Sequence, residues 1–105
     1  MPEPRFDTVI HAPNRLQICA LLTPLDEAEF QVLRDELGVS DSVLSKHIKQ
    51  LVEAGYVRLR KSTYEGRPRT WAKLTRDGRR AFSAHVEELR RLAALADELP
   101  AASDS

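Results

Sequence analysis

The side chains best suited to chemistry in this 105-residue chain are hydrogen-bond donors near its middle. Between residues 40 and 54, the spacing of Leu44, Ile48 and Leu51 predicts a helix with one buried face. At about 100° per residue, the opposite face carries polar side chains, namely Ser42, Ser45, Lys46, Lys49 and Gln50. Lysine can donate to guanine, glutamine pairs with adenine, and serine bonds to bases or phosphates. This face has the chemistry for reading DNA, although a solvated helix without a partner shows similar residues.

A second group of donors lies in a predicted hairpin. Residues 56–61 and 70–75 are strand-like, and residues 64–69 form a turn-rich connector between them. Arg67 and Arg69 flank Pro68, which stiffens the tip and favours entry of the arginines into a narrow minor groove. Lys61 and Thr63 can contact backbone phosphates. A solvated hairpin tip without a DNA role is the alternative.

The charge distribution supports the first interpretation of both groups. The chain has 16 basic and 16 acidic residues, and a net charge of zero argues against a partner that is rich in phosphate. The middle, residues 40–80, carries a net charge of +7, whereas residues 1–39 carry −4 and residues 81–105 carry −3. Because screening limits charge interactions to about 8 to 10 Å, phosphates respond to this basic block more than to the total.

Short helices must position the donor-rich face. Apolar residues at near-helical spacing from Asn14 to Leu22 predict a first helix, and the sequence leaves open whether this helix already begins before Pro13. Asp26 and Glu29 have the spacing of a capping box, which predicts a second helix ending at Gly38. Ser40 caps the third helix, which ends near residue 54. Two short helices joined by a tight turn form a helix-turn-helix, with the second helix presented to the major groove.

A long helix is predicted after the hairpin, from about residue 76 to residue 99. Thr75 is suited to cap it, and Asp77 lies in its first turn. Its apolar stripe is longer than so small a lobe can cover, so we interpret it as the interface of a homodimer. The predicted dimerisation residues are Phe82, His85, Val86, Leu89, Leu92, Ala93, Ala96 and Leu99.

Three segments in this order carry a family likeness: residues 43–57 (VLSKHIKQLVEAGYV), residues 69–71 (RTW) and residues 74–79 (LTRDGR). Over about residues 8–95 the chain resembles small single-domain winged-helix transcriptional regulators of the broad MarR and ArsR type. The resemblance implies a homodimer that binds a pseudo-palindromic operator in double-stranded DNA and regulates nearby genes. Unlike metal-sensing members, the chain has no cluster of cysteine and histidine ligands on the corresponding helices.

The predicted fold is mainly α with a small β-hairpin, that is, an α+β winged helix-turn-helix with a long C-terminal dimerisation helix. One domain spans residues 1–99, with the helix-turn-helix at about 26–54, the wing at about 56–75 and the C-terminal helix at about 76–99. Residues 100–105 are expected to form a flexible tail. His47 falls about 60° from the core direction of the helix at 40–54, at its flank, and is expected to pack or to contact a phosphate. The complete predicted DNA-binding set is Ser40, Ser42, Ser45, Lys46, His47, Lys49, Gln50, Lys61, Thr63, Arg67 and Arg69.

Other functions have little support in the sequence. The single cysteine, Cys19, excludes an intrachain disulfide and is expected to be a small buried apolar side chain. We find no spacing typical of a metal site, no cofactor motif and no catalytic motif, and therefore expect no enzyme and no cofactor. No apolar run is long enough to cross a membrane, so the expected location is the cytoplasm, with no membrane partner.

Two alternatives to a DNA-binding regulator stay open. Winged helices also serve as protein-interaction modules without DNA binding, because fold does not fix function. A regulator that responds to a ligand or to redox state through Cys19 is the second alternative. The sequence identifies no small-molecule effector, no operator and no direction of regulation.

Overall fold

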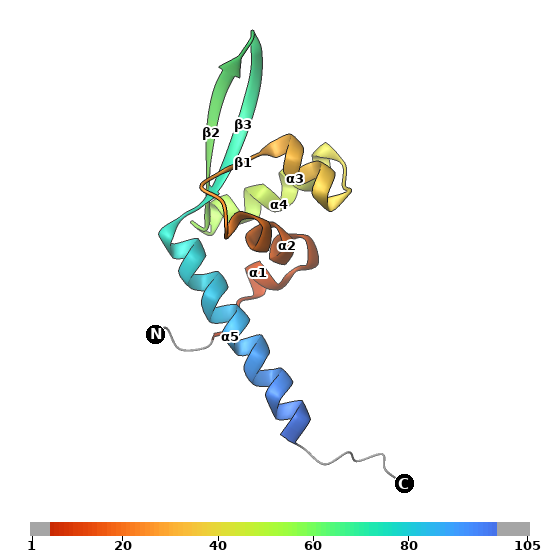
Figure 1. Ribbon diagram of the computed structural model, residues 1–105, viewed down its shortest axis with the longest axis vertical. Coiled ribbons are helices and arrows are strands. Elements are labelled where there is room, and N and C mark those ends of the chain that lie inside the picture. Colours follow the sequence, from red (N-terminus) through yellow and green to blue (C-terminus); the bar gives the residue numbers. More distant parts are fainter. Residues whose placement is uncertain (1–4, 99–105) are drawn as a thin grey trace.

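The computed structural model describes residues 5–98, which form five helices and one three-stranded antiparallel sheet (Figure 1). In chain order the elements are α1 (Thr8–His11), α2 (Pro13–Leu22), β1 (Ala28–Glu29), α3 (Phe30–Leu37), α4 (Asp41–Glu53), β2 (Val57–Tyr64), β3 (Arg67–Leu74) and α5 (Arg76–Glu98). The strand order is β1-β3-β2. The predicted fold class is confirmed. Leu99 and the predicted tail at 100–105 lie outside the described residues.

The first predicted helix is observed as α2, and a separate helical turn precedes it. The Asp7 carboxylate accepts hydrogen bonds from the amides of Val9 (2.9 Å) and Ile10 (3.0 Å), so it caps α1. Ala12 then leaves the helical region, because a residue that precedes proline is disfavoured there. Pro13 occupies the first turn of α2, where the missing amide proton is tolerated.

The capping box predicted at Asp26 and Glu29 is wrong. Residues 28–29 are extended and pair with β3, with Ala28 opposite Ala72 and Glu29 opposite Trp71. The Glu29 carboxylate accepts from Arg69 of β3 at 2.6 Å instead of reaching back to a helix amide. Helix α3 therefore begins at Phe30, and Glu29 makes no side-chain capping bond. A distant strand partner determines the local structure here, which local spacing does not reveal.

The helix that carries the donor-rich face is observed as predicted. Ser40 caps α4, with its hydroxyl accepting from the Val43 amide at 3.2 Å. Gly38 ends α3 in the left-handed region at φ 66°. Leu44, Ile48 and Leu51 of α4 are buried in the core, which also contains side chains of α1, α2, α3 and the sheet.

The hairpin has longer strands and a shorter turn than predicted. Strands β2 and β3 are eight residues each. Their pairing runs from Val57 opposite Leu74 at the base of the hairpin to Tyr64 opposite Arg67 at its tip. Only Glu65 and Gly66 form the turn, at φ 51° and 79°. Positive φ at both central residues is the geometry that matches the twist of a two-residue hairpin. The six-residue connector expected at 64–69 is therefore wrong, and Pro68 lies within β3.

Helix α5 joins the lobe closely at its start and leaves it further along. The Thr75 hydroxyl accepts from the Gly78 amide at 2.9 Å, as expected of a cap. A Cβ atom at Gly78 would lie 2.1 Å from the carbonyl oxygen of Tyr56, so only glycine allows this approach. Figure 1 shows the C-terminal half of α5 extending beyond the lobe. No helix within residues 5–98 is long and apolar enough to cross a membrane.

Candidate nucleic-acid interface

The outward face of α4 presents every donor side chain that the helical periodicity assigned to it. The five residues are all exposed, whereas the three apolar residues on the other face are buried: the exposed set is Ser42, Ser45, Lys46, Lys49 and Gln50. Ser40 is exposed as well, with its hydroxyl oxygen 3.1 Å from that of Ser42. The first turn of α4 and its outward face thus form one continuous polar surface, which we call the α4 face.

An ion pair between Arg34 and Asp41 offsets the negative charge at the start of the α4 face. This pair was not predicted from the sequence. Asp41 is the first residue of α4, where a free carboxylate would repel phosphates. Arg34 of α3 donates to it at 2.8 Å, and this hydrogen bond raises the pKa of the guanidinium. The seven-residue separation across the turn gave no helical signal for the contact. The positive charge of Arg34 therefore balances the negative charge of Asp41 at the edge of the α4 face.

His47 packs against α2 instead of joining the α4 face. The side chain is half-buried, and its ring nitrogens lie 3.2 Å from the amide nitrogen of Asn14 and 3.3 Å from a guanidinium nitrogen of Arg15. Burial lowers the pKa of His47, and the charges of Arg15 and Lys46 lower it further. This position supports the packing interpretation of His47, and we do not retain it as a DNA-contacting residue.

The hairpin separates the four wing residues onto two faces of the sheet. Directly paired residues in an antiparallel sheet share a face, and successive residues alternate. Lys61 pairs with Thr70, and Thr63 pairs with Pro68, so these lie on the face that borders a groove toward α4. Arg67 pairs with Tyr64, and Arg69 pairs with Ser62, which places both arginines on the opposite face. The structure therefore does not bring the four side chains together.

The two arginines on that face differ in what they contact. Arg67 is exposed near the turn. Arg69 is half-buried, forms the ion pair with Glu29 and lies 5.2 Å from the ring of Tyr64. Its Nε is buried and has no hydrogen-bond partner among residues 5–98. Arg69 thus ties β3 to β1, and the prediction that it enters DNA beside Arg67 does not fit its position.

Helix α5 carries the predicted dimerisation residues in three environments. Phe82 packs partly against the core, and His85 is completely buried within the protomer, so His85 is not available to a partner. Val86 and Leu89 are half-buried, while Leu92, Ala93 and Ala96 are exposed. Leu95 is also exposed, at 43%, although it lies off the stripe that the spacing defined. The unpaired apolar surface is therefore at the distal part of α5.

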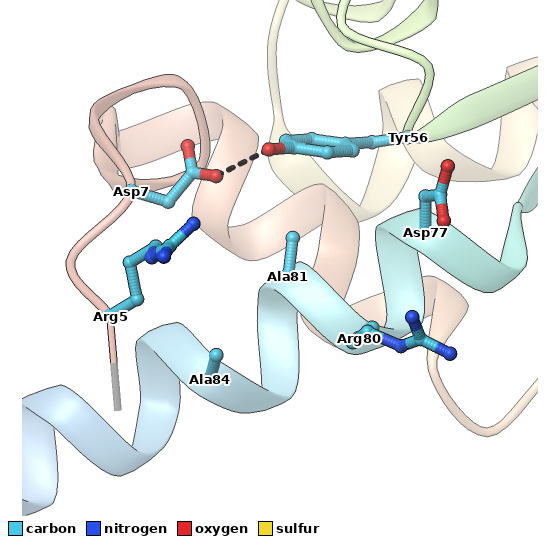
Figure 2. Close-up of a pocket in the computed structure, with 7 residues that line it drawn as sticks. All are labelled: Arg5, Asp7, Tyr56, Asp77, Arg80, Ala81 and Ala84. Carbon is cyan, nitrogen blue, oxygen red and sulfur yellow. Dashed lines mark hydrogen bonds between the residues drawn. The ribbon is translucent and has the colours of Figure 1, made fainter. Parts of the chain in front are cut away.

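An open pocket lies where the N-terminal segment, Tyr56 and α5 meet (Figure 2). The Tyr56 hydroxyl donates to the Asp7 carboxylate at 2.6 Å, which raises the pKa of Tyr56 to about 12. Arg5 of the N-terminal segment and Arg80 of α5 also line this pocket, and the guanidinium of Arg80 points away from Arg5 and Asp7 (Figure 2). Cys19 is buried in the core, as expected, and burial raises its pKa to about 12, which leaves the thiol protonated and unreactive.

A helix-turn-helix followed by a two-stranded wing and a long helix defines the winged-helix class. Residues 14–93 match the family model for a winged helix DNA-binding domain. An uncharacterized protein of Methanocaldococcus jannaschii is 39% identical over 87 residues, covering 83% of this chain and 90% of that protein. The structure of a transcriptional regulator homologue from Pyrococcus horikoshii OT3 matches with a TM-score of 0.80 at 27% identity, covering 85% of this chain and 88% of that one. HlyU from Vibrio cholerae N16961 matches with a TM-score of 0.59 at 25% identity, covering 82% and 85%.

The chain therefore belongs to the winged helix DNA-binding domain family. Its structural neighbours are transcriptional regulators of the MarR-like kind, which confirms the resemblance given by its sequence motifs. Two of the solved structures that match it, at 27% and 28% identity, are named as a transcriptional regulator homologue and a possible transcriptional regulator.

Proposed function

We propose that this protein is a homodimeric transcriptional regulator that binds a specific pseudo-palindromic sequence in double-stranded DNA. The observation that carries the proposal is the α4 face, on which two lysines, a glutamine and the serines are all exposed beside a capped helix start. This face enters the major groove, where lysine and glutamine discriminate bases and serine also contacts phosphates. The family membership supports the same assignment.

The wing makes a smaller contribution in this proposal. Lys61 lines the groove next to α4, Thr63 lies on the same face of the sheet, and both contact the phosphate backbone. Arg67 lies next to the two-residue turn, at the tip of the hairpin, and reaches the adjacent minor groove. Arg69 stays on Glu29 and holds the hairpin to β1.

A test of DNA binding starts with selection of bound fragments from the source genome, followed by titration of a selected fragment at several salt concentrations. If a dimer contacts six or more phosphates, its affinity should fall by about a thousandfold between 50 and 200 mM salt. Absence of binding at 50 mM salt, or binding that does not respond to salt, would contradict the proposal and favour a protein-interaction module.

The distal part of α5 forms the dimer interface in this proposal. Leu92 is 40% exposed and lies on one apolar stripe with half-buried Leu89 and exposed Ala96. A two-fold pairing of this stripe would set two α4 faces about 34 Å apart, one turn of DNA. It also accounts for a helix that extends beyond its own lobe.

The dimer is tested by introducing a charge into the stripe. The variant L92E should sediment as a monomer at concentrations at which the unaltered protein is a dimer, because a carboxylate cannot be buried without a partner. V32E is the matched control, since Val32 of α3 is 50% exposed and lies outside the stripe. Equal masses for L92E and V32E would place the interface elsewhere.

A further inference from the structure

A fully buried histidine joins the N-terminal segment to α5. His85 has no exposed surface, and it is the one buried polar or charged residue found among residues 5–98. Its Nδ1 lies 3.0 Å from the backbone nitrogen of Asp7, and its Nε2 lies 3.0 Å from Nδ1 of His11. The ring of Phe6 covers both imidazoles, with its centroid 4.6 Å from that of His11 and 4.8 Å from that of His85.

The hydrogen bonds fix the proton positions on both rings. A backbone amide can only donate, so Nδ1 of His85 must be the bare nitrogen that accepts from Asp7. The proton of neutral His85 is then on Nε2, and it is donated to Nδ1 of His11. His11 is therefore also bare at Nδ1 and carries its own proton on Nε2. This chain of donors runs in one direction from Asp7 through His85 to His11.

No additional proton fits into this chain. A proton added to Nδ1 of His85 would point at the amide proton of Asp7, and one added to Nδ1 of His11 would point at the proton of His85. Reversing the bond between the two rings would require His85 to carry its proton on Nδ1, where it again meets the Asp7 amide. Every protonated arrangement thus breaks at least one of the two hydrogen bonds.

We propose that Asp7, His11 and His85 form an acid-labile clamp, which holds the N-terminal segment and α1 against α5 at neutral pH and opens when a proton is taken up. His11 is exposed and gives the proton access, whereas His85 can be protonated only when the contact separates. The clamp itself does not depend on the proposed DNA binding, whereas its effect on regulation rests on the proposed function.

The groups around His85 have opposing effects on its pKa. Burial and the neighbouring His11 lower the pKa of His85, while Asp7 and Glu88 raise it, and the net shift is downward. The Asp7 carboxylate is occupied by the α1 amides and the Tyr56 hydroxyl, and Glu88 is paired with Arg91. Since the folded pKa lies below the unfolded value of about 6.5, the stabilisation is complete above that pH and is lost as the pH falls below it.

In the proposed regulator, opening the clamp would affect Tyr56, at the junction of α4 and the wing, and the dimerisation helix α5. Asp7 also contacts Tyr56, which lies between α4 and the wing (Figure 2). On α5, His85 lies four residues before Leu89, the first residue of the proposed dimer stripe. If the proposed function holds, acid should therefore weaken DNA binding through the arrangement of the dimer, beyond any direct effect on the α4 face.

Nuclear magnetic resonance of the unaltered protein tests the clamp without DNA. The chain has three histidines, so the ring nitrogens give few signals, and their shifts distinguish bare from protonated nitrogen. At pH 8 we expect both His11 and His85 to be bare at Nδ1. Hydrogen exchange of the Val9 and Ile10 amides, corrected for the intrinsic pH dependence, should become at least tenfold less protected between pH 7.5 and 5.5.

Two variants separate the clamp from general acid effects. H85N keeps an acceptor for the Asp7 amide but has no titrating ring, so protection of α1 should lose its pH dependence. H47N is the matched control, because it removes another histidine with a lowered pKa and should keep the acid response of α1. Protection that does not change with pH in the unaltered protein, or His85 that titrates at 6.5 or above while the Asp7 amide stays protected, would overturn the proposal. The unaltered protein alone decides the matter if H85N does not fold.

Discussion

Helix α4 and the hairpin both carry basic side chains that are predicted to contact DNA, but the two elements arrange these side chains differently. On α4 the five outward residues share one exposed surface. On the hairpin, Lys61 and Thr63 lie on one face, and Arg67 and Arg69 lie on the other. Two sets of similar composition thus become one continuous surface and one divided surface. The difference shows how strongly each kind of secondary structure constrains the direction of its side chains.

A helix fixes the direction of every residue once its core residues are known. Three buried positions on α4 determine the outward face, because the backbone advances by about 100° per residue. In a hairpin, the face depends on pairing and turn length, and a shift of one residue moves a side chain to the other face. The turn at Glu65-Gly66 lacks the asparagine or aspartate typical of such turns, so its position was weakly signalled.

The largest expected effect is on the helix side of this comparison. The double variant K46Q/K49Q removes four positive charges from the α4 faces of a dimer. We expect a loss of DNA affinity of about a hundredfold at 150 mM salt, and a salt slope that is smaller by about 3 to 4, because fewer counterions are released. Fluorescence anisotropy with a selected fragment measures both quantities.

The control for this variant is R58Q/K73Q. Arg58 and Lys73 are exposed, are directly paired on the sheet, and lie on the face away from the groove next to α4. The same charge is removed in both double variants. If the two lose affinity equally, total charge determines binding, and the α4 face has no special role.

The hairpin should respond less, and only at its exposed tip. We expect R67Q to lower affinity by about tenfold at most and to reduce the salt slope of the dimer by about 2, since each protomer loses one phosphate-range charge. The measurement is the same salt titration. An effect as large as that of K46Q/K49Q would mean that the divided hairpin contributes as much as the continuous helix face.

The same contrast explains which parts of the structure could be predicted. The caps at Ser40 and Thr75 and the core of α4 follow from local spacing, so α4 and the start of α5 were predicted correctly. Strand β1 depends on a partner more than 40 residues away, and local residues gave no indication of it. Asp7 in front of residues 8–11 is a capping signal that could have revealed α1, and with it the cover over His85.

The smallest expected effect concerns Arg69, which separates structure from binding on one face of the hairpin. R69Q removes the ion pair with Glu29, a carboxylate that is 17% exposed, and should lower the free energy of unfolding by about 1 kcal/mol. A double-mutant cycle with E29Q, measured by urea unfolding, isolates the interaction of the pair. The salt slope of DNA binding should stay unchanged, because the guanidinium is committed to Glu29. A slope reduced by about 2, as expected for R67Q, would instead mean that Arg69 leaves Glu29 and contacts phosphate when DNA is bound.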